Sequence, residues 1–160
     1  MNKFGAQSKN DAAQRLAEAV GRGMYARDVA AQALGIALLE IRPGYARVSM
    51  SVRPDMVNGH DICHGGLIFT LADTAFAYSC NAYNRTAVAQ HCTITFLAPA
   101  RRGDVLTAEA VEQARSGRNG VYDIKVTNQK GEVVALFRGN SRVIEGEVVP
   151  GLAAAARESS

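Results

Sequence analysis

Tryptophan is absent from the sequence, and aromatic residues of all kinds make up only 6% of it. Proteins that bind single-stranded nucleic acid stack bases on aromatic side chains, and such platforms are scarce here. Charge of one sign is scarce too, because 18 lysines and arginines against 15 aspartates and glutamates leave a net charge of +3. The basic residues are scattered rather than clustered, which argues against a nucleic-acid partner but suits an anionic ligand.

Cysteine is also sparse, with three residues at positions 63, 80 and 92. An odd, small number in a chain of 160 residues argues against a disulfide scaffold and indicates reduced thiols.

No continuous apolar stretch follows the first lysines, so we predict no secretory signal. The longest apolar-rich segment, residues 65–83, carries Asp73, and a charge there is costly in a bilayer. We therefore expect a cytoplasmic protein without a membrane partner.

Hydrophobic periodicity predicts two helices near the N-terminus. Asn10 or Asp11 is suited to cap the first helix. The apolar residues of this helix fall on one face, at Ala13, Leu16, Ala17 and Val20. Asp28 is suited to cap a second, short helix that ends at Gly35.

A strand pair, a long helix and four more strands follow. Residues 45–53 alternate between apolar and polar side chains, as a half-buried strand requires. Residues 36–41 form the preceding strand, joined to it through the turn pair Pro43-Gly44. Residues 65–83 are apolar nearly all round, which predicts a helix buried on most sides. The four later β-rich segments are residues 87–97, 105–115, 120–128 and 132–145.

This order of elements predicts an α+β fold. Two strands, one long helix and four strands fit a six-stranded, largely antiparallel sheet wrapped around a central helix, which is the hotdog fold. We expect one such domain over residues 24–148. A partly helical extension at residues 1–23 precedes it, and a flexible tail at residues 149–160 follows.

The start of the long helix is a candidate binding site. His64, Gly65 and Gly66 stand there, where unpaired backbone N–H groups carry partial positive charge and glycine lets a ligand approach closely. Such donors suit a developing oxyanion. The alternative is that the two glycines only permit a tight passage from loop to helix.

Asp73 is the only formal charge between His64 and Arg85. A carboxylate on a buried apolar helix is costly unless it is hydrogen-bonded or takes part in a reaction. Burial beside a cleft would suit it to act as a general base or a nucleophile. A purely structural, hydrogen-bonded carboxylate is the alternative.

The sequence around these residues resembles the phenylacetate-degradation (PaaI-type) branch of the hotdog-fold acyl-CoA thioesterases. The segments that carry the resemblance are residues 58–60 (Asn-Gly-His), 63–66 (Cys-His-Gly-Gly) and 71–78 (Leu-Ala-Asp-Thr-Ala-Phe-Ala-Tyr). Weaker similarity extends it over residues 24–145. The N-terminal extension, the basic pair at 101–102 and the alanine-rich tail depart from the family pattern.

The resemblance implies hydrolysis of acyl-CoA thioesters to free acid and CoA. It implies arylacetyl substrates of the phenylacetyl or hydroxyphenylacetyl type, or related compact acyl groups. The Gly65 N–H would polarise the thioester carbonyl, and Asp73 would be general base or nucleophile. Asn58 and His64 would position substrate and water. No cofactor is implied, since coenzyme A is part of the substrate and product.

The family also implies self-association, as a homodimer and further as a homotetramer. Helical geometry supports shared sites, because Gly65 and Asp73 are eight residues apart and so lie roughly 12 Å apart along one helix. One reacting carbon cannot touch both. Two antiparallel helices related by a two-fold axis could bring Gly65 of one chain opposite Asp73 of the other.

Further candidates for substrate binding are Gly66 and four basic residues. Arg101, Arg102, Arg118 and Arg138 could hold the phosphates of coenzyme A, although exposed arginines are often only solvated.

We predict no metal site, although His60, Cys63, His64, His91 and Cys92 invite the question. The spacing in residues 60–64 is not one typical of zinc, and neighbours at 91–92 on a strand face opposite ways. Cys63 beside a histidine could act as a nucleophile, but a small buried thiol is the simpler interpretation.

Two other functions remain open from the sequence. A hotdog domain could be an acyl-CoA dehydratase or hydratase, which needs a histidine and an acid to move a proton on the acyl chain. It could also be a non-catalytic acyl-CoA-binding module that acts as a regulator. Against this, the sequence shows no helix-turn-helix or basic extension that would read DNA, and position 73 holds a carboxylate.

Overall fold

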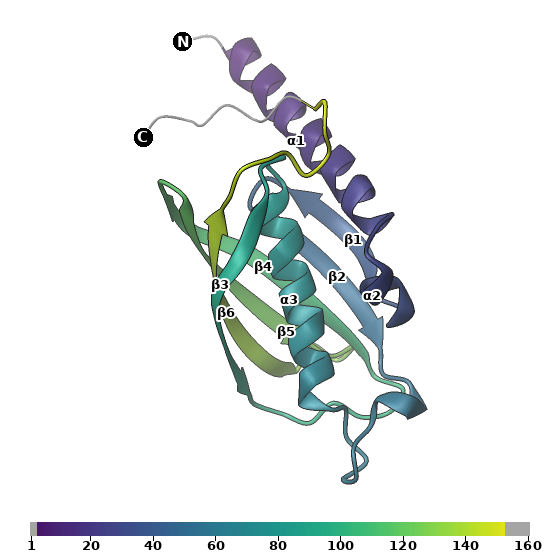
Figure 1. Ribbon diagram of the computed structural model, residues 1–160. Helices are drawn as coiled ribbons and strands as arrows, with labels where there is room; N and C mark the ends of the chain where they lie inside the picture. Colours follow the sequence, from purple (N-terminus) through teal and green to yellow (C-terminus); the bar gives the residue numbers. More distant parts are fainter. Residues whose placement is uncertain (1–2, 153–160) are drawn as a thin grey trace.

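The computed structural model describes residues 3–152 (Figure 1). Its elements are α1 (Lys3–Tyr25), α2 (Val29–Ala33), β1 (Ala37–Arg42), β2 (Tyr45–Ser51), η1 (Pro54–Met56), α3 (Gly65–Asn81), β3 (Ala87–Phe96), β4 (Val105–Ser116), β5 (Asn119–Thr127) and β6 (Val133–Val143). The strands form one six-stranded sheet in the order β1-β2-β4-β5-β6-β3, and every neighbouring pair is antiparallel. The predicted α+β hotdog fold is confirmed. No helix within residues 3–152 is long and apolar enough to cross a membrane.

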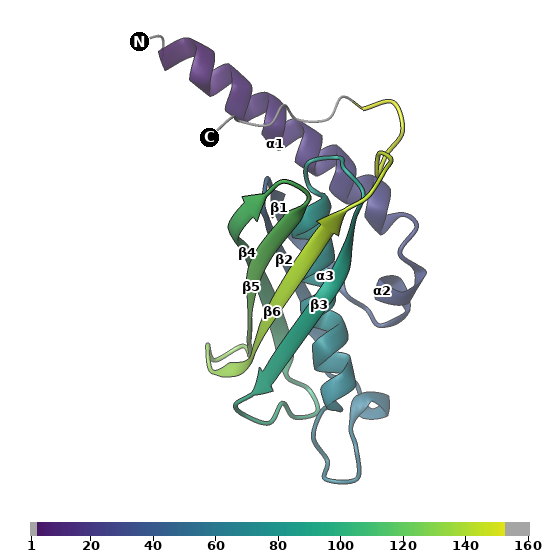
Figure 2. The same cartoon turned by 60° about the vertical axis from the view of Figure 1, so that its left-hand side comes forward.

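Helix α3 lies in the hollow of the sheet (Figures 1 and 2). Its side chains at Leu71, Ala75 and Phe76 are buried, and burial of one large apolar side chain contributes about 1.5–3 kcal/mol. Gly139 on β6 makes room for this packing, because a Cβ there would lie 2.8 Å from three ring atoms of Phe76. The helix is thus fixed against the sheet by close contact along its buried face.

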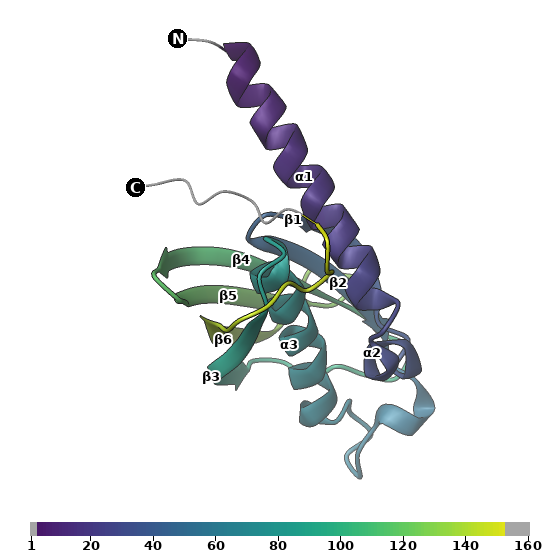
Figure 3. The same ribbon diagram turned by 45° about the horizontal axis from the view of Figure 1, so that its top comes forward.

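Helix α1 begins earlier than predicted. A cap at Asn10 or Asp11 was expected, but the helix runs from Lys3. No proline or strong breaker separates residues 3–12 from the rest, so the helix continues through the candidate caps. Ala17 and Val20 are buried near β1, whereas the first turns extend beyond the sheet (Figure 3).

The predicted cap of α2 is confirmed. The Asp28 carboxylate accepts a hydrogen bond from the Ala31 N–H at 3.0 Å. Its second oxygen accepts one from the Tyr78 hydroxyl on α3 at 3.3 Å. Asp28 therefore both begins α2 and joins it to the central helix.

The segment after β6 is held by Asn84. This residue is buried, has a φ of 56° and sits just beyond α3. Its amide donates to the carbonyls of Val149 and Leu152 and accepts from the Val149 N–H. Residues 149–152 of the predicted tail thus contact the domain, while residues 153–160 lie outside the described residues.

Strand β3 forms one edge of the sheet, beside α3 (Figure 2). Within residues 3–152, β6 is its only strand partner. Val88 and Phe96 on this strand are 44% and 50% exposed, and Leu97 just after it is 56% exposed. A long edge strand with an open side and exposed apolar residues is a surface that readily pairs with another strand.

Candidate active site

The loop before α3 is organised by Asn58. Its Oδ1 accepts hydrogen bonds from the backbone N–H groups of His60 at 2.9 Å and Ile62 at 3.5 Å. The Asn58 backbone N–H donates to the Ile62 carbonyl. Because the amide oxygen is engaged in this turn, the Nδ2 group is left as the free end. It has no acceptor among the described residues, and Asn58 lines a pocket. Asn58 thus offers a donor there.

His64 is the N-cap of α3, with φ −61° and ψ 130°. Its Nδ1 accepts a hydrogen bond of 3.4 Å from the Gly66 N–H. A neutral histidine that accepts through Nδ1 carries its proton on Nε2, so His64 presents a donor at that atom. Gly66, a predicted substrate-binding residue, has its N–H directed at this ring within the protomer.

Gly65 is the first residue of α3, where a backbone N–H has no partner inside the helix. Its N–H has no acceptor among the described residues. A Cβ at this position would lie 3.0 Å from Cζ of Phe96, so the aromatic ring covers the backbone here. The predicted oxyanion donor is thus free and flanked by an apolar wall.

A pocket of about 320 Å³ brings Asn58 and Gly65 together. It lies between the loop before α3, the first turns of α3 and the connection from β3 to β4. Its lining residues are Asn58, Ile62, Cys63, Gly65, Ile68, Phe96, Leu97, Ala98, Pro99 and Ala100. Most of these side chains are apolar, so the pocket pairs two polar donors with a wall suited to a compact organic group.

Asp73 lies two turns further along α3 and is half-buried. Burial raises the pKa of its carboxyl group above the usual value. Its carboxylate has no hydrogen-bond partner among the described residues. Burial raises the pKa of the Cys92 thiol on β3, and the charge of Asp73 raises it further. The Asp73 carboxylate is therefore close enough to β3 for its charge to influence the Cys92 thiol. The alternative of a purely structural, hydrogen-bonded carboxylate has no support among residues 3–152.

Gly65 and Asp73 lie on one continuous helix, as predicted. Eight residues at about 1.5 Å per residue separate them by roughly 12 Å along the axis. One protomer therefore does not bring the oxyanion donor and the carboxylate to the same point.

Two of the predicted basic residues lie beside the pocket. Arg101 and Arg102 follow Ala100 directly, and Arg101 forms an isolated β-bridge with Ile62. Arg102 is paired with Asp61, with 2.5 Å between Nη2 and Oδ1. Both arginines are exposed.

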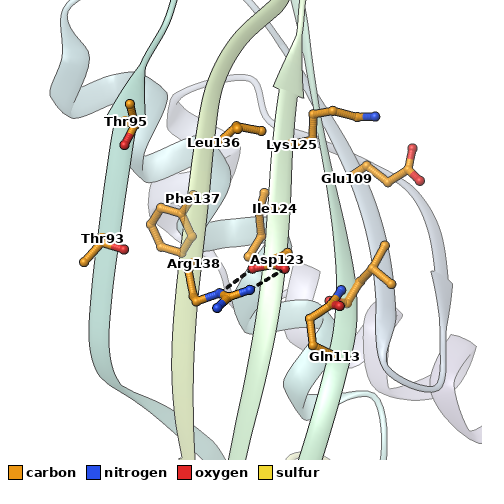
Figure 4. Close-up of a pocket in the computed structure, with 11 residues that line it drawn as sticks. Thr93, Thr95, Glu109, Gln113, Asp123, Ile124, Lys125, Leu136, Phe137 and Arg138 are labelled. Atoms are coloured by element: carbon orange, nitrogen blue, oxygen red, sulfur yellow. Dashed lines mark hydrogen bonds and ion pairs between the residues drawn. The ribbon is translucent and has the colours of Figure 1, made fainter.

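The other two basic residues lie elsewhere in the protomer. Arg118 is in the turn between β4 and β5, at the far end of β4 from Arg102, roughly 40 Å away along a twelve-residue strand. Arg138 lines a hollow of about 550 Å³ on the sheet (Figure 4). Two of its guanidinium nitrogens donate to Asp123, at 2.6 and 2.7 Å, and this guanidinium lowers the pKa of that carboxyl. Their contact with substrate phosphates stays a prediction.

Comparison with known proteins assigns the family. Residues 60–135 match the thioesterase superfamily. The acyl-coenzyme A thioesterase PaaI of Escherichia coli K12 is 50% identical over 125 residues, which cover 78% of this chain and 89% of that protein. This chain belongs to the thioesterase superfamily. Members are hydrolases acting on thioester bonds, so the predicted enzyme class and the predicted PaaI-type resemblance are confirmed.

Solved structures of the thioesterase superfamily show the same fold. The E. coli PaaI protein from the phenylacetic acid degradation operon superposes with a TM-score of 0.83 and 48% identity, covering 84% of this chain and 97% of that one. A variant of the phenylacetic acid degradation protein PaaI from Thermus thermophilus gives 0.71 and 37%, covering 73% and 100%. A Streptococcus mutans UA159 protein solved with acetyl-CoA bound gives 0.67 and 26%, covering 70% and 90%.

Two residues at or beside the candidate site did not stand out in the sequence. Phe96 covers Gly65, and the alternation of inward residues along β3 could have placed it there. Asp61 pairs with Arg102, and no local signal in the sequence indicates this contact between segments 41 residues apart.

The cysteines and histidines of this thioesterase do not gather. Among residues 3–152 there is no group of three or more metal-ligating side chains. His91 is exposed, whereas Cys92 packs against the core. Cys63 is buried, and burial raises the pKa of its thiol, which disfavours the thiolate that a nucleophile requires.

Proposed function

We propose that this chain hydrolyses arylacetyl-CoA thioesters, of the phenylacetyl or hydroxyphenylacetyl type or similarly compact, to the free acid and CoA. The observation that carries the proposal is Asp73, a half-buried carboxylate with a raised pKa and no hydrogen-bond partner among the described residues. Perturbed carboxylates of this kind are typical of general bases. The E. coli relative is an acyl-coenzyme A thioesterase, which supports thioester hydrolysis, and its origin in the phenylacetic acid degradation operon supports an arylacetyl substrate.

The reaction requires water to add to the thioester carbonyl carbon. The Gly65 N–H and the Asn58 amide would donate to the carbonyl oxygen as it gains negative charge. Asp73 would accept the proton of the attacking water, and the His64 Nε2–H would orient substrate and water. The tetrahedral intermediate would then expel CoA as thiolate, which takes up a proton. Direct attack of Asp73 on the carbonyl is the alternative course, which would expel CoA thiolate and form a mixed anhydride. Water attack on the aspartyl carbon of that anhydride would leave a solvent oxygen in the carboxylate, whereas attack on the acyl carbon would leave it in the product acid.

The reacting centre would lie between two copies of the chain. The open β3 edge, with exposed Val88 and Phe96, supports pairing with a second copy beside Asp73. A two-fold axis there would place Asp73 of one chain opposite Gly65 of the other, giving two sites per dimer. We propose further that dimers associate into homotetramers.

The phosphates of coenzyme A would contact Arg101 and Arg102 beside the pocket. Gly66, at the start of α3, would also contact the substrate. In an oligomer, Arg118 and Arg138 are proposed as further phosphate contacts from a neighbouring copy. No cofactor is needed beyond the coenzyme A of the substrate. A cytoplasmic location stays a prediction based on the reduced thiols.

Replacement of Asp73 by asparagine tests the proposal. Asp73→Asn keeps the shape of the side chain but removes the base, and loss of a general base lowers the rate by about 10² to 10⁴. We expect kcat for phenylacetyl-CoA to fall by on the order of 10² or more, with an unchanged KM and oligomeric state. Thiol release measures the rate, and light scattering measures assembly.

The same assay separates the other functions. A dehydratase or hydratase would convert enoyl-CoA and leave saturated acyl-CoA intact. A binding module would bind acyl-CoA without thiol release in the wild-type protein. Full activity in folded Asp73→Asn protein would exclude the role of this carboxylate.

A further inference from the structure

An ion pair links the two segments that flank the pocket, although neither of its residues lines the pocket itself. Arg102, in the connection from β3 to β4, reaches Asp61 in the loop before α3, with 2.5 Å between Nη2 and Oδ1. Both segments lie beyond the N-terminal end of α3 (Figure 1). They are also joined by a backbone hydrogen bond of 2.7 Å from Cys63 to Ala100. The ion pair is the outermost of these links, because its two side chains are 54% and 69% exposed.

Asp61 is held in place by the same turn that orients Asn58. Its backbone has a φ of 56°, in the left-handed region that aspartate tolerates better than most residues. The Asp61 N–H donates to the Asn58 carbonyl at 3.0 Å. The carboxylate is thus presented beside the pocket by a fixed loop that also holds a proposed donor to the substrate.

Asp61 occupies one nitrogen of the Arg102 guanidinium, so a bidentate phosphate contact that uses this nitrogen must displace the carboxylate. An exposed pair of this kind contributes about 0.2–1 kcal/mol. A phosphate offers the guanidinium a charge-assisted bidentate contact that is stronger than the one it replaces. Exchange of Asp61 for a phosphate on Arg102 would therefore be favourable overall, but competition from the carboxylate would weaken the gain.

We propose that Asp61 is a specificity-determining residue that competes for Arg102 beside the pocket until the phosphates of coenzyme A displace it. This inference rests on the proposed function. In the absence of substrate the carboxylate occupies the guanidinium nitrogen that a phosphate would otherwise contact. Only thioesters that carry a phosphate can exchange with Asp61, so the pair acts on recognition of the coenzyme and not on the acyl group.

Asp61→Asn removes the competing charge and keeps a residue that tolerates positive φ. We expect KM for phenylacetyl-CoA to fall by about 1.5- to 5-fold with kcat unchanged, the range that an exposed ion pair allows. With the phenylacetyl thioester of N-acetylcysteamine, which has no phosphate, we expect kcat/KM to be the same as for wild type.

Asp55→Asn is the matched control for charge. Asp55 lies on η1, is 67% exposed and pairs with Arg53, so the change removes one exposed paired carboxylate near the same loop. A long-range effect of net charge would lower KM equally in both variants. The proposal requires a larger effect at position 61. In an Arg102→Gln background, Asp61→Asn should change KM no more than Asp55→Asn does.

Three results would overturn the proposal. These are a raised or unchanged KM in Asp61→Asn, an equal effect of Asp55→Asn, or an undiminished effect without Arg102. Calorimetric titration with CoA alone separates this from the proposed hydrolysis, because Asp61→Asn should bind CoA more tightly by the same factor. If wild type released no thiol but this binding difference held, the proposed reaction would fail while the role of Asp61 stood.

Discussion

Removal of the backbone N–H group of Gly65 tests the proposed active site most directly. Gly65→Pro deletes this donor at the first residue of α3, a position where proline is favoured. The residue before a proline must be extended, and His64 already has a ψ of 130°. We therefore expect the variant to fold with α3 intact.

Gly65→Ala is the control for the Cβ that both substitutions add. Both variants introduce a Cβ 3.0 Å from Cζ of Phe96, and this half-exposed ring must shift by a few tenths of an ångström in each. Only the proline variant lacks the N–H. Loss of one oxyanion donor costs about 2.7–4 kcal/mol, or roughly 10²- to 10³-fold in kcat. We expect Gly65→Pro to be slower than Gly65→Ala by that factor in thiol-release assays.

Mixing Gly65→Pro with Asp73→Asn extends the test to the shared site. Random exchange of subunits makes half of the dimers mixed, and each mixed dimer has one site with both residues intact. Activity should recover to about a quarter of wild type. The activity of each variant by itself, at the same total protein concentration, gives the baseline.

Two outcomes would refute this reasoning. Equal kcat in folded Gly65→Pro and Gly65→Ala proteins would remove the N–H from the reaction. Absence of recovery, with subunit exchange demonstrated by mass spectrometry of tagged chains, would place Gly65 and Asp73 in the site of a single subunit.

Three further predictions concern pH, the C-terminal segment and a helix cap. Burial raises the pKa of Asp73 and the ionised form is the base, so kcat/KM should rise with pH through a pKa above that of an exposed aspartate. Because the folded protein disfavours the ionised form, stability should fall between the unfolded and folded pKa values as pH rises, and Asp73→Asn should unfold at a higher temperature than wild type at neutral pH. Asn84→Gly keeps the positive φ but removes three hydrogen bonds, which should lower the free energy of unfolding by about 1.5–4 kcal/mol in urea titrations. Asp28→Ala should cost about 0.5–2 kcal/mol, and Asp28→Asn, which can still cap α2, should cost less.

Much of the fold was predictable because each element carries its own periodicity. The alternation in residues 45–53 and the apolar run after position 64 led to β2 and α3 within a few residues of their observed bounds. The start of α1 was not predictable in this way. A capping residue marks a helix end only where the chain before it cannot continue the helix, and here nothing interrupts the helix before Asn10.

The candidate site could be proposed from the sequence where chemistry and helix position coincide. Gly65 and Asp73 stand out because one is a glycine at a helix start and the other a charge on an apolar helix. Phe96 and Asp61 did not stand out, since their roles come from contacts between segments far apart in the chain. The sequence also did not distinguish Arg101 and Arg102, which lie beside the pocket, from Arg118 and Arg138, which lie elsewhere. Their separation in space follows from the order of the strands in the sheet.

The packing of α3 explains why the proposed site requires two chains. A near-attack geometry needs the reacting atoms within about 3–3.5 Å of each other, whereas α3 spaces its two functional positions by roughly 12 Å. A bend could shorten that spacing, but α3 contains no proline and its buried face is fixed against the sheet at Leu71 and Phe76. The close packing that stabilises the helix therefore also keeps Gly65 and Asp73 apart. In the proposed dimer, a second copy paired along the open edge of β3 would place its own Gly65 opposite Asp73.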